Sequence, residues 1–326
     1  MNISNYTVLN YTPLNNLKFR SRFKSKWGMC LVFAVILTSS MIFTLQYSSF
    51  LNSKPVIQGV ETKNTGVGIK SLVITPSSTL DLLVYDELQN KKDKYAVAVK
   101  NLETGESLYI NEDKEFLTAS LYKIWVMAVV FQKIEEGSLS IDDNLKQDVT
   151  ILNKKFNIAT EDADLQSGTV EFTVREALNK MITVSDNYAA LLLNEKIGVV
   201  SLSKFLLDFG FDQSQISQPP VTTAHDMNLF FEKLYRGEFA NEQYTNDMIE
   251  LLLAQELNDS IPKYITDKVK IAHKTGHLYT VTHDAGIVYT ANGDYIITIM
   301  SEGENEPDAK EMMAKISERV YEYFSE

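Results

Sequence analysis

Hydrophobic positions along the chain recur with helical spacing in some stretches and alternate as in strands in others. Residues 80–90, "LDLLVYDELQN", place apolar side chains three and four positions apart, which predicts a helix. Residues 94–110, "KYAVAVKNLETGESLYI", contain two strand-like runs around "ETGE" and predict a β-hairpin. Residues 120–137, "SLYKIWVMAVVFQKIEEG", predict a strongly apolar helix that ends at Gly137.

The middle of this region has helical periodicity, and its last part returns to strands. Helical runs, several of them ending at glycine, cover residues 173–182, 187–198, 201–210, 223–239 and 245–257. From Val269 onward, "VKIAHKTG", "HDAGIVYTANG" and "DYIITIMSEG" have strand patterns, and residues 306–324 predict a last helix. We therefore expect an α/β fold of the α+β type. One antiparallel sheet is built from both ends of the domain and flanked by helices, with an inserted all-helical domain at about residues 130–266.

A long apolar stretch precedes this region. Residues 27–47, "WGMCLVFAVILTSSMIFTLQY", carry no charge and are long enough to cross a hydrocarbon core of roughly 30 Å as a helix. Five basic and no acidic side chains lie in residues 1–26, so the positive-inside rule predicts a cytoplasmic tail followed by a transmembrane anchor. Residues 48–78, rich in small and polar side chains, predict a linker to a domain at 79–324. The sequence thus predicts a single-pass protein of the cell membrane with its domain outside the cytoplasm.

Two other interpretations of residues 27–47 compete with the anchor. A cleaved signal peptide would have a shorter apolar region and a small-residue cleavage site, which Thr38, Ser39 and Ser40 provide only in part. A buried core helix does not fit the basic flank. Whether the anchor is cleaved stays open.

Composition and charge narrow the classes of partner. The 326 residues are 44% hydrophobic and 23% charged, which is a globular composition. The formal net charge is −12, and the domain is more acidic still because the N-terminal tail is basic. A surface of that sign disfavours nucleic acid as a partner. The single cysteine, Cys30, excludes an intramolecular disulfide without deciding the compartment. Nothing in the sequence fixes an oligomeric state.

Three short motifs follow one another along the domain. The pattern S-x-x-K occurs four times, at Ser21, Ser120, Ser201 and Ser260, whereas Ser185-Asp-Asn and Lys274-Thr-Gly occur once each. Only Ser21 and Ser120 precede both rarer motifs, and Ser21 lies in the basic tail. Order and context therefore select Ser120 and Lys123.

This order of motifs resembles the serine penicillin-recognising enzymes, specifically the class A β-lactamases and the D,D-peptidases of that fold. The stretches "TVREALNKMITVSDNYAALLL" and "TTAHDM" are similar to the same family, and the resemblance covers about residues 80–324. A serine hydroxyl needs a base within reach, and positions i and i+3 of a helix share a face, so Lys123 can serve Ser120. Burial and a second cation, Lys274, are expected to lower the pKa of Lys123.

The resemblance also implies roles for the other motif residues. Ser185 would pass a proton toward the leaving nitrogen, and Asn187 would hydrogen-bond the substrate's amide side chain. Lys274 and Thr275 would hold the substrate carboxylate, and Gly276 would let the substrate backbone lie close to the strand. The oxyanion hole would be formed by the backbone N–H groups of Ser120 and His277.

The family pattern breaks between Gly210 and Thr222. Class A β-lactamases carry a glutamate there that positions the water for deacylation, but "FDQSQISQPPV" contains none. Its acid, Asp212, lies at the wrong end of the stretch, and Gln213, Gln215 and Gln218 can orient a water but cannot act as a base. The sequence therefore supports acylation of Ser120 and weakens fast deacylation.

Three functions remain open at this point. They are β-lactam hydrolysis, D,D-peptidase action on the acyl-D-Ala-D-Ala end of a peptidoglycan stem peptide, and a penicillin-binding module that is acylated without turnover. A Ser-His-Asp triad or a metal site built from His225, His273, His277 and His283 is disfavoured, because Lys123 already supplies a base. No metal and no cofactor is expected. Together the motifs predict an enzyme, a serine hydrolase that acts on amide bonds.

Overall fold

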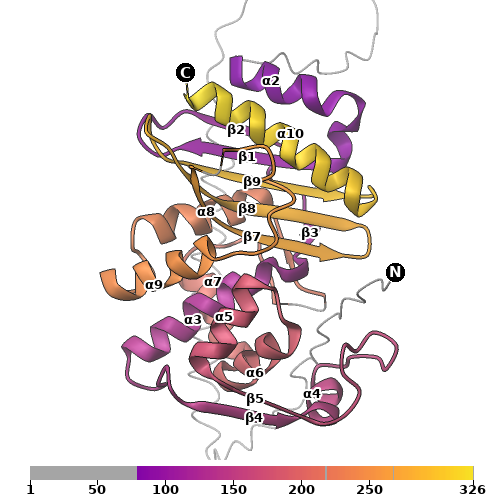
Figure 1. Ribbon diagram of the computed structural model, residues 1–326, viewed down its shortest axis with the longest axis vertical. Helices are drawn as coiled ribbons and strands as arrows, with labels where there is room; N and C mark the ends of the chain where they lie inside the picture. Colours follow the sequence, from indigo (N-terminus) through magenta and orange to yellow (C-terminus); the bar gives the residue numbers. More distant parts are fainter. Residues whose placement is uncertain (1–78, 217–218, 267, 326) are drawn as a thin grey trace, which may run out of the picture. The chain divides into compact units, whose positions relative to one another are not determined.

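The structure, a computed structural model, describes residues 79–216, 219–266 and 268–325 (Figure 1). The predicted tail, anchor and linker at residues 1–78 lie outside this part of the chain. Within the described residues, no helix combines the length and the apolar character that a membrane crossing requires.

The elements follow one another as the periodicity predicts, with a few additions. The helices are α2 (Thr79–Leu88), α3 (Lys123–Glu135), α4 (Val149–Lys155), α5 (Val174–Thr183), α6 (Asn187–Ile197), α7 (Val199–Asp208), α8 (Ala224–Tyr235), α9 (Glu242–Leu253) and α10 (Glu306–Ser325), with the 3-10 turns η1 (Gln89–Lys94) and η2 (Ala119–Tyr122). The strands are β1 (Tyr95–Asn101), β2 (Ser107–Ile110), β3 (Phe116–Leu117), β4 (Asn144–Asp148), β5 (Thr169–Thr173), β6 (Val221–Thr222), β7 (Lys270–Leu278), β8 (Val281–Tyr289) and β9 (Tyr295–Glu302).

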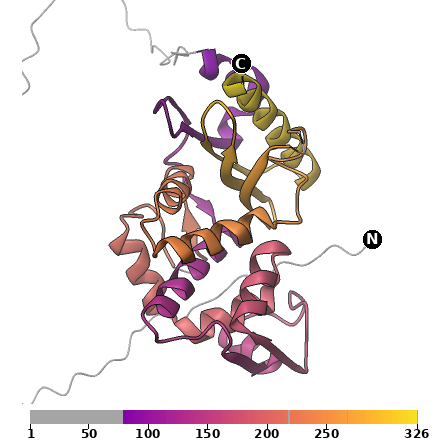
Figure 2. The ribbon, with the colours of Figure 1, turned by 60° about the vertical axis from the view of Figure 1, so that its left-hand side comes forward.

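Strands from both ends of the domain form one antiparallel sheet in the order β2-β1-β9-β8-β7. In β1, Val97 and Val99 pack under α2 and α10, whereas Ala96 and Ala98 face the opposite side, where α8 lies against the sheet. The alternation of large and small side chains therefore lets a helix layer cover each face (Figures 1 and 2). The prediction of a sheet built from both ends and flanked by helices is confirmed.

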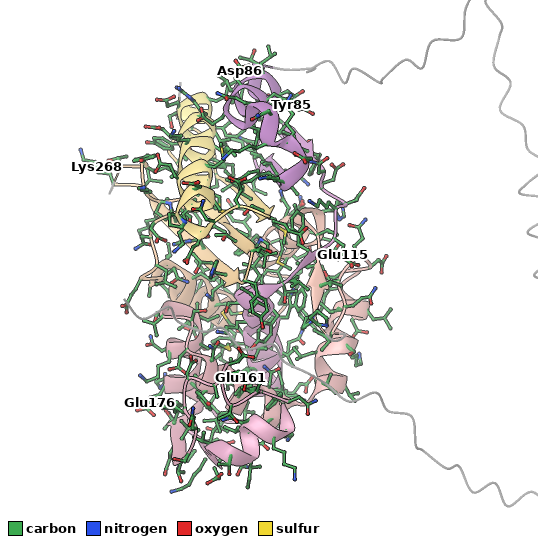
Figure 3. All side chains as sticks on the ribbon, turned by 90° about the vertical axis from the view of Figure 1, so that its right-hand side faces the viewer. Tyr85, Asp86, Glu115, Glu161, Glu176 and Lys268 are labelled. Carbon is green, nitrogen blue, oxygen red and sulfur yellow. The ribbon has the colours of Figure 1, made fainter. Side chains whose placement is uncertain are left out.

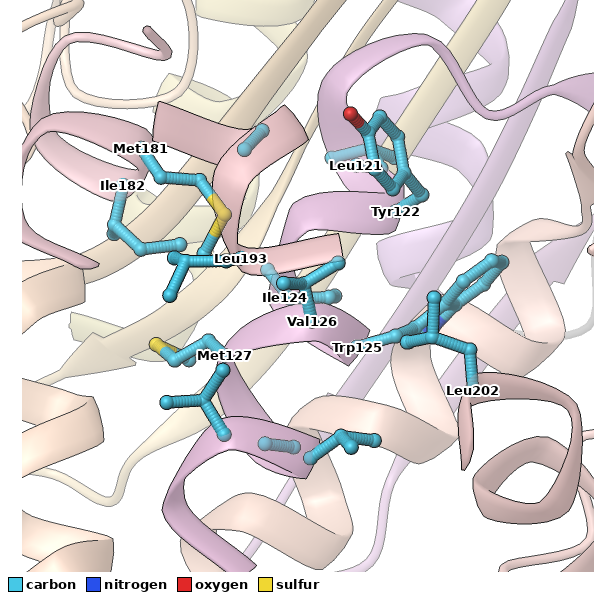
Figure 4. Close-up of a cluster of buried hydrophobic side chains, with 14 of the residues drawn as sticks. Leu121, Tyr122, Ile124, Trp125, Val126, Met127, Met181, Ile182, Leu193 and Leu202 are labelled. Atoms are coloured by element: carbon cyan, nitrogen blue, oxygen red, sulfur yellow. The ribbon is translucent and has the colours of Figure 1, made fainter. Parts of the chain in front are cut away.

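The helix α3 is the centre of the helical region. Its residues from Lys123 to Phe131 are buried, and α5, α6, α7 and α9 pack around it. Figure 4 shows Met127 of α3 in the same apolar cluster as Met181 of α5 and Leu193 of α6. Two charged side chains of this region, Glu161 in a turn and Glu176 in the first turn of α5, are exposed (Figure 3). A helix that is buried on all sides has apolar residues at almost every position. The sequence of α3 therefore predicts a buried helix clearly.

The expectation of an all-helical insertion was wrong. Strands β4 and β5 form an antiparallel pair within it, and the two-residue β6 pairs with β3. Each strand of the β4–β5 pair buries a single side chain, Leu145 in β4 and Val170 in β5. With two buried positions in ten residues, the sequence lacks the alternation of apolar and polar residues that would predict strands between the surrounding helical patterns.

We expect Gly286→Ala to destabilise the fold. A Cβ atom at this position of β8 would lie 2.4 Å from the carbonyl oxygen of Ala272 and 2.8 Å from Cα of His273, both in the backbone of β7. Backbone atoms of a paired strand cannot move aside singly, so the loss in unfolding free energy should reach about 3 kcal/mol or more. Chemical denaturation measures it.

The matched control is Gly105→Ala, where a Cβ atom meets nothing within 4 Å and only the left-handed backbone, at φ 76°, resists the change. That loss should be about 1–2 kcal/mol. Equal losses at the two positions would show that crowding against β7 is not the cause at Gly286.

Candidate active site

The three sequence motifs meet at one cavity. Ser120 lies in η2, Ser185 and Asn187 lie where α5 gives way to α6, and Thr275 and Gly276 lie in β7. All five border the same cavity of about 1210 Å³, a volume that includes space open to solvent. His277 borders it as well, and the side chains of Lys123 and Lys274 are buried beneath it. The structure thus brings together every residue that the motifs singled out.

Two residues at the motifs have a left-handed backbone. Ala119, directly before Ser120, has φ 45°, and Ser185 has φ 60°, both in the left-handed region that favours glycine. Such conformations cost of order 1–3 kcal/mol each and persist only where the surroundings enforce them. Ser120 therefore lies in a tight 3-10 turn, and the α-helix proper begins at Lys123.

Lys123 is held by the second motif. Its Nζ donates to the backbone carbonyl of Ser185 at 2.6 Å, to Ser185 Oγ at 3.2 Å and to Asn187 Oδ1 at 2.9 Å. A direct bond from Lys123 to Ser120 Oγ is not among the hydrogen bonds of the described residues. Ser185 Oγ also accepts from Lys274 Nζ at 3.1 Å, so one hydroxyl lies between two amines.

Both amines have lowered pKa values. Burial, and then the positive charge of Lys274, lower the pKa of Lys123 well below its ordinary value, with Asp186 and Asp164 opposing the shift. Burial lowers the pKa of Lys274 to about 7, and Asp284 opposes this. The shift favours the neutral amine of Lys123, which is the form able to accept a proton. The direction of this shift agrees with the expectation from sequence.

Gly276 is needed for a reason that the sequence did not reveal. A Cβ atom there would lie 3.3 Å from the backbone nitrogens of Ser120 and Leu121. The space was expected to serve a substrate backbone, but its described neighbours belong to η2. Glycine lets η2 pack against β7, which brings the N–H of Ser120 beside the strand that carries His277.

Asn187 and His277 each have partners within the chain. Asn187 Nδ2 donates to Asp164 Oδ2 at 2.9 Å, a partner that the sequence did not single out. His277 Nδ1 lies 3.1 Å from Thr282 Oγ1, and its Nε2 lies 3.4 Å from a carboxylate oxygen of Glu306. Burial lowers the pKa of His277 below its ordinary value. Because both ring nitrogens already face partners, His277 is poorly placed to act as a general base.

A buried polar network braces the third motif. His273 Nδ1 lies 2.8 Å from Asp284 Oδ1, and its Nε2 lies 2.9 Å from Asn258 Oδ1. The backbone N–H of Ile261 donates to the other oxygen of Asp284 at 3.0 Å. Gln255 Nε2 donates to the carbonyl of Ile182 at 2.9 Å, near the end of α5. Residues 255–261 therefore tie the helix before Ser185 to the strand that carries Lys274.

In the described part of the stretch between Gly210 and Thr222, Gln213 and Ser214 bond partners other than Ser120. The buried carboxylate of Asp226 accepts hydrogen bonds from the backbone N–H of Gln213 at 3.0 Å and from Ser214 Oγ at 2.7 Å. The Gln213 side chain donates to Asp113. Asp212 borders a separate surface hollow with Leu206 and Phe211. Of the candidates weighed from sequence, Gln218 lies outside the described residues.

A second, narrow pocket adjoins Ser120 on the side of this stretch. Its volume is about 610 Å³, including space open to solvent. Ile158, Leu191, Pro219 and Pro220 are among its walls. Among the described residues that line it, none is Asp, Glu, Lys or Arg. No carboxylate of the described chain is therefore placed here to activate a water.

Comparisons with known proteins agree with this geometry. A family model described as the beta-lactamase enzyme family matches residues 79–324. A beta-lactamase of Bacteroides uniformis is 26% identical over 75% of this chain and 91% of its own length, and beta-lactamase VEB-1 of Pseudomonas aeruginosa is 24% identical over 76% and 91%. The solved structure of PBP-A has a TM-score of 0.66 at 22% identity, covering 77% of this chain and 97% of PBP-A. A PBP-A mutant, solved as an acyl-enzyme complex with penicillin G, has a TM-score of 0.65 at 23% identity, covering 77% and 99%.

We expect Lys274→Met to stabilise the fold near pH 6. Because the folded-state pKa of Lys274 is lowered to about 7, the unfolded chain binds more protons between that pH and the ordinary lysine value of about 10.4. The stability of the unchanged protein should therefore rise across this window, and the variant should lack that rise. Chemical denaturation should find the variant more stable by about 1–3 kcal/mol near pH 6, with the difference shrinking toward pH 9 or above.

The control is Lys196→Met, which changes an exposed lysine of α6. Its effect on stability should be small and should not vary with pH across this window. A Lys274→Met variant that is less stable near pH 6 would contradict the cost assigned to the buried amine.

Proposed function

We propose a function from the premise that this chain belongs to the beta-lactamase enzyme family and is therefore a serine hydrolase that acts on amide bonds. In our proposal Ser120 forms an acyl-enzyme with a β-lactam or with an acyl-D-Ala-D-Ala peptide of peptidoglycan. The observation that carries the proposal is the Ser185 hydroxyl, which lies between two buried amines beside Ser120.

The geometry supports the following acylation. Ser120 Oγ attacks the carbonyl carbon as its proton passes to the neutral amine of Lys123, directly or through Ser185. The backbone N–H groups of Ser120 and His277 stabilise the oxyanion. The carbon–nitrogen bond then breaks as the leaving nitrogen takes a proton from Ser185 Oγ, which Lys123 replaces. In this arrangement Thr275 faces the substrate carboxylate, and the buried amine of Lys274 lies behind it.

We propose that the acyl-enzyme, once formed, is long-lived. The pocket beside Ser120 is lined by no carboxylate among the described residues, and both ring nitrogens of His277 face other partners. Slow deacylation fits a D,D-peptidase-like enzyme or a slow β-lactamase better than an efficient one. A penicillin-binding module that is acylated without turnover is the alternative, and the same pocket favours it.

For location, we propose that residues 27–47 anchor the protein in the cell membrane and that the domain faces outward. The support is the uncharged stretch with its basic flank, together with the place of the proposed peptide substrate outside the cytoplasm.

We expect incubation with benzylpenicillin to add its mass to the protein at Ser120. Intact-mass spectrometry over time should show an adduct that persists for many times the acylation time. Ser120→Ala should abolish the adduct because it removes the nucleophile. Ser201→Ala is the matched control, since Ser201 also begins an S-x-x-K pattern but its Oγ bonds the carbonyl of Ile197. An adduct that survives Ser120→Ala would identify another nucleophile.

We expect Pro219→Glu to shorten the lifetime of the acyl-enzyme. Pro219 lines the pocket beside Ser120 and is exposed, so a carboxylate at this position can reach a water near the ester. A positioned general base is worth at least about a hundredfold, and an imperfectly placed one about tenfold. Pro219→Gln is the control, because it has the same shape without the base. Equal lifetimes in the two variants would mean that a missing base in this pocket does not limit deacylation.

A further inference from the structure

Asp164 lies outside the three motifs but contacts the second one, and we infer that it is a positioning residue for the reaction at Ser120. Its carboxylate fixes the side-chain amide of Asn187 in the one orientation that suits both the substrate and the base, Lys123. Asp164 and Asn187 border the same cavity, the one of about 1210 Å³. This inference rests on the proposed acylation of Ser120.

The amide of Asn187 lies between an amine and a carboxylate. Its Oδ1 accepts a hydrogen bond from Lys123 Nζ at 2.9 Å, and its Nδ2 donates to Asp164 Oδ2 at 2.9 Å. The amide nitrogen carries a second N–H, for which the described residues provide no hydrogen-bond partner. Because Asn187 borders the cavity, this second N–H is the group left to bind the substrate's amide side chain.

Asp164 decides which end of this amide faces Lys123. The two ends of an amide have almost the same shape, so their hydrogen-bond partners set the orientation. An ionised carboxylate only accepts hydrogen bonds and therefore holds the NH₂ end toward itself. A neutral amine both donates and accepts, so Lys123 alone tolerates either end. With the amide reversed, Asn187 would donate to the lone pair that Lys123 needs for the proton of Ser120, and its oxygen would face the substrate carbonyl.

The segment that carries Asp164 is itself fixed to α6. The hydroxyl of Tyr188, directly after Asn187, accepts from the backbone N–H of Leu165 at 3.2 Å and lies 2.6 Å from the carbonyl oxygen of Leu165. Asn153 Nδ2 donates to the same carbonyl at 2.8 Å. Neighbouring residues of α6 therefore hold neighbouring residues of this segment, which keeps the carboxylate of Asp164 at the amide before a substrate arrives.

The charge of Asp164 has the opposite effect on the base. Its negative charge opposes the lowering of the pKa of Lys123. Loss of that charge alone would favour the neutral amine and speed acylation. Loss of the hydrogen bond to Asn187 would slow acylation, so the direction of the change separates the two effects.

The test measures the rate of acylation by benzylpenicillin with intact mass on the full chain. We expect Asp164→Ala to slow acylation about tenfold, because a hydrogen bond to a charged group no longer fixes the amide. Asp164→Asn should stay within about threefold of the unchanged protein, since the new amide oxygen can accept the same bond. A faster reaction in Asp164→Ala would show that the carboxylate hinders the reaction, and would overturn the inference.

A second substitution tests whether Asp164 acts through Asn187. In an Asn187→Ala background, Asp164→Ala should change the acylation rate by less than about twofold, because the amide that it positions is absent. With penicillanic acid, which lacks the amide side chain, Asp164→Ala should cost less than it does with benzylpenicillin. Equal losses in the two backgrounds, or with the two donors, would overturn the inference.

Gln166→Ala is the matched control in the same segment. Gln166 is exposed, and its Nε2 donates to the carbonyl of Thr160 at 3.3 Å, so the acylation rate should equal that of the unchanged protein. Acylation that is equally fast in Asp164→Ala and in the unchanged protein would overturn the positioning role and leave the proposed acylation standing. Absence of an adduct in the unchanged protein would overturn both.

Discussion

Two lysines buried around one serine hydroxyl are the constraint on which the rest of this structure depends. Lys123 and Lys274 both approach Ser185 Oγ, at 3.2 and 3.1 Å. Two ammonium groups at that spacing in a dry site repel each other strongly, so the pair favours a state in which one amine is neutral. The amines come from different parts of the fold, α3 and β7. The lowered pKa of this pair therefore depends on the packing of the helical region against the sheet.

Several conformationally unfavourable features accompany this arrangement of the two amines. Ala119 and Ser185 have left-handed backbones. The absence of a side chain at Gly276 lets η2 pack closely against β7. Residues 255–261 link the end of α5 to β7 through the buried pair of His273 and Asp284. The strain is local, whereas the bracing is spread over the core. This is the expected pattern where backbone is held in a sparsely populated conformation for function.

The elements and residues that the sequence could predict are those whose signal is local. The apolar run of α3 and the strands of β1 and β7–β9 follow from periodicity, and Ser120, Ser185 and Lys274 follow from three motifs in a fixed order. The antiparallel pair of β4 and β5 was missed because each strand buries one side chain. The contact of Asp164 with Asn187 and the bracing by residues 255–261 were missed for another reason. Tertiary packing alone brings these partners together, so no pattern of residue spacing in the sequence predicts their contacts.

The absence of a glutamate between Gly210 and Thr222 and the apolar lining of the pocket beside Ser120 concern the same place, where a water would approach the ester. A general base for water needs a polar, hydrated position close to the ester, and an apolar subsite needs that same position to be dry. In this chain the backbone N–H of Gln213 and the hydroxyl of Ser214 donate to Asp226, and Pro219 and Pro220 line the pocket beside Ser120. In our proposal, this uncharged wall beside Ser120 slows the release of the acyl group, while Ser120 and the two amines at Ser185 still support its formation.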